Sequence, residues 1–160
     1  MQGKTPAEST STVTVVMQVA HANSAGFVHG GEIMKLVDTT AGVASMRHSN
    51  ARVVTVEVDS LTFLAPVHIG DLVTLDAVVT QAWRSSMEVE VCVRREDPRT
   101  GEHEQTTTAY LTMVAVDEKG RPRPVPPLVA STDEDIKRQR AADVRREERM
   151  RIRQRLEAGS

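Results

Sequence analysis

The chain has 160 residues, 39% of them hydrophobic and 26% charged, which suits one domain or one domain with a tail. Its single cysteine, Cys92, excludes an intrachain disulfide and a zinc site built on several cysteines. With two Phe, one Trp, one Tyr and a net charge of −2, the sequence predicts neither a base-stacking surface nor a general attraction to nucleic acid or anionic membranes.

The chain also lacks the sequence features of membrane insertion and secretion. No stretch approaches the roughly 18–20 apolar residues of a membrane span. Residues 1–12 are polar and hold no apolar segment like that of a signal peptide. We therefore expect a cytoplasmic protein that has neither a membrane nor a nucleic acid as its partner.

The first half of the chain predicts a strand, a loop and one long helix. Residues 12–20 are rich in Val and Thr and favour a strand. Residues 21–31 form a loop by their glycines and an Asn-Ser pair. Residues 32–48 lack proline, and their apolar side chains cover most of the circumference of a helix. Such a helix is expected to be surrounded by protein.

Beyond this helix the apolar residues repeat with a period of two, which indicates strands. Four strands separated by turns are predicted at 52–64, 72–83, 86–95 and 106–117. Strands joined by short turns pair antiparallel. One apolar helix and one antiparallel sheet bury each other most simply when the sheet curls around the helix, so we expect an α+β fold.

The last part of the chain differs from this body. Four prolines within 122–127 favour an extended exit from the domain. We expect a flexible N-terminus at 1–12, a folded domain at 13–128 and a charged helical tail at 129–160. Residues 133–157 mix nine Lys and Arg with seven Asp and Glu, which is typical of a solvated helix packed lightly on an oligomer. Binding of phosphate or nucleic acid by the basic run 145–155 remains the alternative.

Asp38 is the most informative residue of the predicted helix. A buried ionised carboxylate costs several kcal/mol unless it is paired or hydrogen-bonded. The residues one turn before and after it, Met34 and Gly42, cannot pair with it. Asp38 therefore faces a cleft or a second subunit, or it lies on a narrow solvated strip with Lys35 and Thr39. The spacing alone leaves both possibilities open.

Three residues before the helix could contribute to a site. Gly30 and Gly31 allow close backbone approach, and the first N–H groups of a helix have no internal partner, so they could hold an anion or a developing oxyanion. Asn23 could orient a water or a carbonyl through its amide. The alternative is a plain turn, with Asn23 bonded to the nearby backbone.

Other catalytic motifs are missing. The sequence has no Gly-x-Ser-x-Gly elbow. His103-Glu104 is not followed by the second histidine of a zinc motif, because Thr107 stands in its place. We therefore expect no metal ion.

Several stretches, in order and over about residues 13–128, resemble one family. They are NSAGFVHGGEIM at 23–34, LVD at 36–38, VTVEVD at 54–59, FLAPV at 63–67, GD at 70–71, RSSMEV at 84–89 and MVAVD at 113–117. These stretches, together with the predicted order of strands and helix, resemble the hot-dog-fold acyl-coenzyme A thioesterases. The resemblance is to the cytosolic acyl-CoA hydrolase branch of that family. The resemblance implies hydrolysis of acyl-CoA to a carboxylic acid and free coenzyme A, and a role in fatty acid metabolism.

The resemblance also implies catalytic roles. The catalytic pair falls on Asn23 and Asp38, which should come from different subunits, so that a homodimer is the smallest active unit and a hexamer (a trimer of dimers) the expected assembly. Asp38 would act as general base, or as nucleophile, and Asn23 would orient the water or the thioester. The N–H groups of Gly30 and Gly31 would hold the carbonyl oxygen.

Substrate-binding residues follow in the same way. The candidates for coenzyme A are Arg84, Ser85 and Ser86 at a turn between strands, together with Thr55. Met34 and Phe63 are expected to line the acyl pocket. The turn could also be an ordinary polar hairpin. No cofactor is expected, because coenzyme A is part of the substrate.

Two other functions remain as alternatives. A hot-dog domain can bind acyl-CoA without hydrolysing it, as a binding or sensing module. The domain could also serve as a scaffold, with the charged tail as its interaction element. The presence of both Asn23 and Asp38 favours the enzyme.

Overall fold

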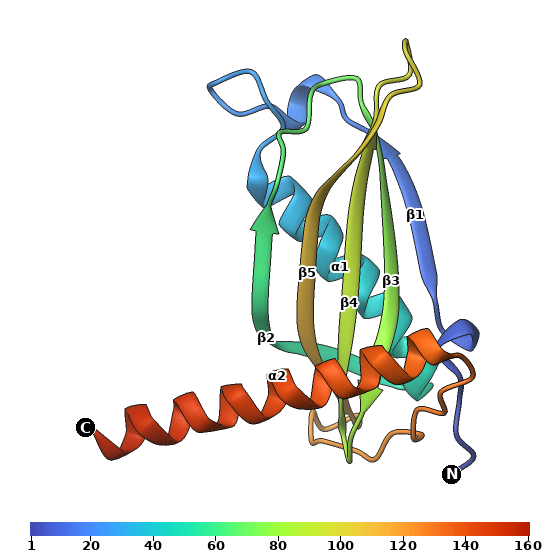
Figure 1. Cartoon of the computed structure of the whole chain (residues 1–160), viewed down its shortest axis with the longest axis vertical. Helices are drawn as coiled ribbons and strands as arrows, with labels where there is room; N and C mark the ends of the chain where they lie inside the picture. The colour runs from blue at the N-terminus through green and yellow to red at the C-terminus, as the bar shows by residue number, and fades with distance from the viewer.

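Five antiparallel strands form one sheet in the order β1-β3-β4-β5-β2, with helix α1 across one face and helix α2 across the other (Figure 1). The computed structural model describes residues 1–160. Its elements are β1 (Ser11–Val16), α1 (Gly30–Ser49), β2 (Arg52–Phe63), β3 (Leu72–Ala82), β4 (Ser86–Glu96), β5 (His103–Val116) and α2 (Asp133–Ala158), with single 3₁₀ turns at Pro6–Glu8 and Val19–His21. The predicted antiparallel sheet, central helix and C-terminal helix are confirmed.

The first strand ends earlier than the predicted residue 20. Its last residue is Val16, because the backbone of Met17 pairs with the turn before β3: its N–H donates to Asp71 O and its carbonyl accepts from Gly70 N–H. Val19–His21 then form a 3₁₀ turn. This turn starts the loop that leads to α1.

The core lies between α1 and the sheet and is aliphatic. Alternation along β4 places Met87, Val89, Val91 and Val93 on the inner face, as the period of two predicts. The helix meets them with one buried stripe, which holds Ile33, Val37, Ala41 and Ala44. No aromatic side chain belongs to the buried cluster.

The prediction that α1 is surrounded by protein is wrong for the single chain. The sheet covers only one face of the helix, since a five-stranded sheet of this width does not close around it. On the open face, 47% of Met34 and 44% of Met46 are exposed, and Asp38 lies between them. The edge strand β2 also exposes Val54, Val56 and Val58 and carries two β-bulges.

Helix α2 crosses the outer face of the sheet, and its second half extends beyond the body (Figure 1). The crossing point is held by Glu88 of β4, whose side chain is fully buried. Arg145 donates to both oxygens of this carboxylate, at 2.6 and 3.1 Å, and Arg149 lies 3.5 Å away. Arg149 also pairs with Asp59 of β2 at 3.2 Å. The middle of the helix is therefore clamped by ion pairs at Arg145 and Arg149 rather than packed lightly.

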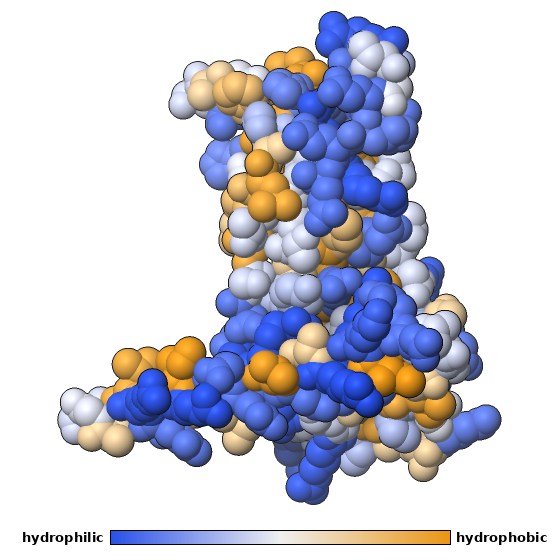
Figure 2. All heavy atoms as spheres, in the orientation of Figure 1, coloured by the Kyte–Doolittle hydropathy of each residue, from blue (hydrophilic) through white to orange (hydrophobic).

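The part of α2 that extends beyond the body carries both hydrophobic and charged side chains. Figure 2 shows hydrophobic patches among charged side chains along this helix, and Met150, Ile152 and Leu156 are half or more exposed. Neither helix has a stretch apolar and long enough to cross a membrane.

A buried histidine joins the end of α1 to the proline-rich segment. His48 is fully buried, and its Nε2–H donates to the carbonyl of Pro126 at 2.9 Å, while Nδ1 has no partner. Burial lowers the pKa of His48 below its usual value, although the hydrogen bond to Pro126 opposes this shift. The folded protein therefore holds His48 neutral.

Replacing Arg145 with methionine should lower the free energy of unfolding by about 2 kcal/mol, because the buried Glu88 carboxylate loses its closest cation. Urea denaturation at a fixed protein concentration measures the change. The double variant with Glu88→Gln should regain part of the loss, since no charge then remains to be compensated. Wild-type stability in the single variant would contradict this role of the ion pair.

The buried His48 predicts acid sensitivity. The unfolded chain takes up a proton on this side chain near pH 6.5 and the folded chain only at a lower pH. The contribution of His48 to the free energy of unfolding should therefore be constant above about pH 6.5 and fall as the pH drops below that value. A His48→Gln variant can still donate to Pro126 but does not titrate, so its urea midpoints between pH 7.5 and pH 5.5 should fall less than those of the wild type. Equal declines would show that His48 is not responsible.

Candidate functional site

Helix α1 begins at a loop that leaves one backbone donor free. His29 is the N-cap, and its Nδ1 accepts the N–H of Gly31 at 2.8 Å. Its carbonyl accepts the N–H of Glu32 at 2.9 Å. The Gly30 N–H has no acceptor within the chain. Of the two predicted oxyanion donors, the structure thus leaves Gly30 available and engages Gly31.

An apolar pocket of about 410 Å³ lies beside this free N–H. Asn23, Gly30 and Phe63, three of the predicted site residues, line it together. A Cβ atom at Gly30 would lie 3.3 Å from the Phe63 ring, so glycine permits the close approach of helix and ring. The remaining walls are Phe27, Val28, Ile33, Leu64, Ala65, Pro66 and Val67. The pocket suits an apolar group whose polar end meets the helix N-terminus.

The side-chain oxygen of Asn23 holds its own loop, while the side-chain NH₂ group stays free to donate. Its Oδ1 accepts the N–H groups of Ala25 and Phe27, each at 3.0 Å, as a turn residue does. Its Nδ2 donates no hydrogen bond within the chain. The side chain is therefore fixed by one end and can donate to a carbonyl or a water with the other.

Asp38 lies apart from this pocket, on the open face of α1. It is eight residues beyond Gly30, about 12 Å along the helix axis at the usual rise. Thr55 of β2 donates its hydroxyl to Asp38 Oδ1 at 2.5 Å. The structure thus places the Thr55 hydroxyl against the predicted catalytic carboxylate. Met34, predicted as an acyl-pocket wall, shares the open face with Asp38 and does not line the pocket.

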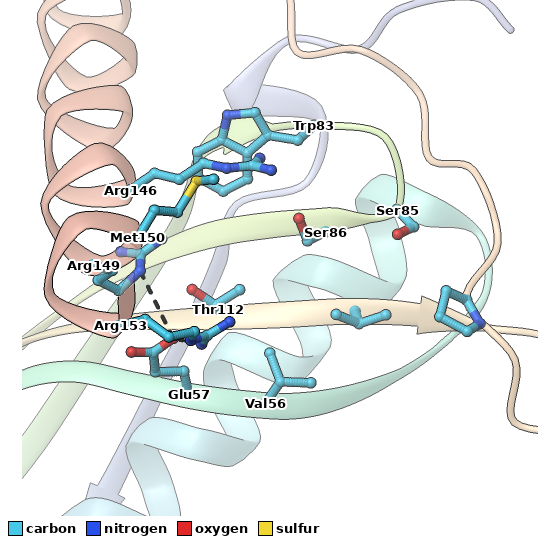
Figure 3. Close-up of a pocket in the computed structure, with 12 residues that line it drawn as sticks. Val56, Glu57, Trp83, Ser85, Ser86, Thr112, Arg146, Arg149, Met150 and Arg153 are labelled. Carbon is cyan, nitrogen blue, oxygen red and sulfur yellow. Dashed lines mark ion pairs between the residues drawn. The ribbon is translucent and has the colours of Figure 1, made fainter. Parts of the chain in front are cut away.

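The predicted coenzyme A residues lie elsewhere, at the turn between β3 and β4. Ser85 and Ser86 line a second pocket of about 350 Å³ under α2 (Figure 3). Arg84 is exposed and does not line this pocket. Three arginines of α2 do: Arg146, Arg149 and Arg153. These arginines belong to the basic run 145–155, for which sequence analysis kept phosphate binding as an alternative.

Comparison with known proteins gives the family. A model described as the thioesterase superfamily matches residues 25–102. An uncharacterized acyl-CoA thioester hydrolase of Bacillus subtilis is 40% identical over 127 residues, which are 79% of this chain and 74% of that protein. The human cytosolic acyl coenzyme A thioester hydrolase is 37% identical over 116 residues, or 71% of this chain and 30% of that protein.

Solved structures agree with this result. An apo-hexameric acyl-CoA thioesterase has a TM-score of 0.92 and 36% identity, with 95% of this chain and 97% of that chain covered. The acyl-CoA hydrolase of Staphylococcus aureus, in complex with butyryl coenzyme A and coenzyme A, has a TM-score of 0.88 and 32% identity over 98% of this chain and 95% of that one. The chain therefore belongs to the thioesterase superfamily, and its fold is the predicted hot-dog fold.

The same Staphylococcus aureus hydrolase has been solved as three alanine variants, of an asparagine, an aspartate and a threonine. The three positions follow one another at intervals of 15 and 17 residues. Asn23, Asp38 and Thr55 stand at the same intervals in this chain.

Removal of the His29 cap should loosen the start of α1. A His29→Ala variant leaves the Gly31 N–H without its acceptor, and we expect a loss of about 1 kcal/mol in stability with faster hydrogen exchange at Gly31. A His29→Asn variant should restore most of the protection, because asparagine is also a good N-cap. Unchanged exchange in the alanine variant would show that the cap does not hold the helix start.

Proposed function

We propose that the protein hydrolyses acyl-CoA thioesters to carboxylic acids and free coenzyme A. The observation that carries this proposal is the apolar pocket that ends at the free Gly30 N–H, with the free Asn23 amide beside it. A thioester bound here places its acyl chain against the apolar walls of the pocket. Its carbonyl oxygen then meets the Gly30 N–H and the Asn23 amide, two donors that are already in position. Membership of the thioesterase superfamily and the names of the relatives support the same reaction.

The proposed site is shared between two protomers. About 12 Å of helix separates Gly30 from Asp38, too far for one water to contact both within one chain. In a twofold dimer, the open face of α1 from one protomer can bring Asp38 to the pocket of its partner. The exposed valines of edge strand β2 also need a cover, because an uncovered apolar edge invites association. The hexameric relatives support a homodimer that assembles further into a trimer of dimers.

In the proposed mechanism Asp38 is the general base. It takes a proton from a water whose oxygen attacks the thioester carbonyl carbon. The oxyanion that forms accepts the Gly30 N–H, and the Asn23 amide holds the carbonyl or the water. The intermediate then expels the coenzyme A thiolate, which takes up the proton. Thr55 orients the carboxylate by donating to one of its oxygens. Attack by Asp38 itself remains the alternative.

The intervals in the Staphylococcus aureus hydrolase support these three residues as a unit. The variants of that enzyme target the same three residue types at the same spacing as Asn23, Asp38 and Thr55. In this proposal Thr55 is a positioning residue for Asp38 rather than a contact to coenzyme A.

Substrate contacts complete the proposal. Phe63 is a wall of the acyl pocket, and Met34, which does not line that pocket, lies on the open face that Asp38 shares. Arg84, Ser85 and Ser86 receive the nucleotide part of coenzyme A. The reaction uses no cofactor, and the cytosolic relatives favour a cytoplasmic location.

Asp38→Asn should lower kcat by at least about a hundredfold, because the amide cannot accept the proton of the water. Release of free thiol from short, medium and long acyl-CoAs measures this. Glu118→Gln, the same chemical change at an exposed turn, should leave kcat unaltered. Full activity in Asp38→Asn would overturn the assignment of the base. A wild type that binds acyl-CoA but releases no thiol from any chain length would instead indicate a binding module.

Mixing inactive variants tests whether the site is shared. In mixed dimers of Asn23→Ala and Asp38→Asn subunits, one of the two sites combines the intact Asn23 with the intact Asp38. Random exchange should therefore restore about a quarter of wild-type activity. Verified mixed dimers without any activity would place both residues of a site in one subunit.

A further inference from the structure

Three connections of the chain meet at the end of the sheet that lies farthest from α2 (Figure 1). They are the loop 17–29 that carries Asn23, the connection 64–71 between β2 and β3, and the hairpin 97–102 between β4 and β5. The proposed thioester pocket takes most of its walls from the first two, and the second and third line a polar cavity of about 460 Å³. Asp71 lies in the second connection and contacts both the loop 17–29 and β4.

Asp71 fixes the turn before β3. It is 4% exposed, and its Oδ2 accepts the N–H of His68 at 2.9 Å. The same oxygen lies 3.6 Å from His68 Nδ1 and 3.6 Å from Arg95 Nη1. The backbone carbonyl of Asp71 accepts the N–H of Met17 at 2.9 Å. A charged acceptor makes a stronger hydrogen bond than a neutral one, so the buried carboxylate sets the position of the His68 backbone.

Arg95 ties this carboxylate to the sheet. Its side chain is 12% exposed. Its Nε donates to Glu104 Oε2 of β5 at 2.9 Å, and its Nη2 lies 2.9 Å from the same oxygen. The turn that holds His68 is therefore anchored to two inner strands, β4 and β5, through one guanidinium.

Phe27 connects this turn to the loop of the proposed site. Its backbone pairs with that of His68 in an antiparallel bridge, and the two rings lie 5.5 Å apart at an angle of 56°. The next residue, Val28, donates its N–H to the carbonyl of Val67 at 2.9 Å. Phe27 also exchanges two hydrogen bonds with Asn23: its N–H donates to Asn23 Oδ1 at 3.0 Å, and its carbonyl accepts the Asn23 N–H at 2.7 Å. The position of Asn23 therefore depends on Phe27, and that of Phe27 on His68.

We propose that Asp71 is a positioning residue for thioester hydrolysis: by holding His68 it fixes Phe27, and through Phe27 it orients the free Asn23 amide. The inference rests on the proposed function, in which Asn23 donates to the carbonyl or the water. Asp71 itself does not line the thioester pocket. Residues 24–26 are exposed, so the tip of the loop does not support Asn23 from outside. A displacement of about 1 Å at a catalytic group can cost about a hundredfold in rate.

The first test removes the acceptor of the His68 N–H. Asp71→Ala should lower kcat about tenfold, which is less than the loss expected from deleting the Asn23 donor, and should change the KM for acyl-CoA much less than kcat. Asp71→Asn should recover most of the lost kcat, because its amide oxygen can accept the same N–H. Asp97→Asn removes a carboxylate from the opposite wall of the polar cavity and should leave kcat unchanged.

A double-mutant cycle with Asn23→Ala separates positioning from a general loss of structure. If Asp71 acts through Asn23, then Asp71→Ala should lower kcat no further in a chain that already carries Asn23→Ala. An equal factor in both backgrounds would overturn the proposal, as would wild-type kcat in Asp71→Ala. The exposed His68 supplies a second variant that keeps the buried carboxylate. His68→Ala removes the ring that Phe27 contacts and should lower kcat about threefold, again only when Asn23 is present.

Hydrogen exchange tests this inference independently of catalysis. Asp71→Ala should speed exchange of the N–H groups of Asn23, Phe27 and Val28 about tenfold and leave that of Gly31 unchanged. Unchanged exchange at Phe27 overturns the inference even in a protein that hydrolyses acyl-CoA. If the wild type releases no thiol, the proposed function fails, and faster exchange at Asn23 and Phe27 in Asp71→Ala still supports the fixing of Asn23 by Asp71.

Discussion

A single constraint shapes this protein: the five-stranded sheet can cover only one face of α1. The buried face supplies the core through small and aliphatic side chains, and its close packing fixes the direction of the helix. The open face is left with Met34, Met46 and the Asp38 carboxylate. The same helix also presents its N-terminus to an apolar pocket, two turns away from that carboxylate. The fold thus separates the two parts of the proposed site, and association is what can bring them together.

The outer face of the sheet is held instead by a buried ion pair. Strand β4 carries alternate acidic residues there, and a buried Glu88 would be unfavourable without a cation. Arg145 supplies that cation from a helix 57 residues further along the chain. The ion pair places α2 across β4, and this placement creates the second pocket between the helix and the strands. The tail is therefore a part of the folded body along half of its length.

The fold could be predicted largely because its signals are local. Alternation along 86–95 gave the buried face of β4, and the lack of proline in 32–48 gave the helix. Long-range pairing was not visible: the alternation puts Glu88 on the opposite face of β4 from its apolar residues, and only the arrival of α2 buries it. In the same way, periodicity indicated an enclosed helix, because it cannot tell whether a sheet or a second subunit covers a face.

The candidate site was predicted in part. Asn23, Gly30 and Phe63 come together as neighbours of one pocket, since the loop and the helix start that hold them are close in sequence or space. The engagement of Gly31 was missed, although a histidine two residues earlier is a local signal for a cap. The hydrogen bond from Thr55 to Asp38 was not predicted, because strand alternation does not show which helix residue a hydroxyl meets.

The contact of Arg146 with Trp83, whose ring centre lies 4.4 Å from the guanidinium at the pocket under α2, has a practical consequence for observing the molecule. Trp83 is the only tryptophan of the chain, so all indole fluorescence originates at the wall of the pocket under α2. Its Nε1–H also donates to Asp143 of the same helix at 3.1 Å. Emission is therefore an intrinsic reporter of whether α2 is seated on the sheet, and it requires no added label.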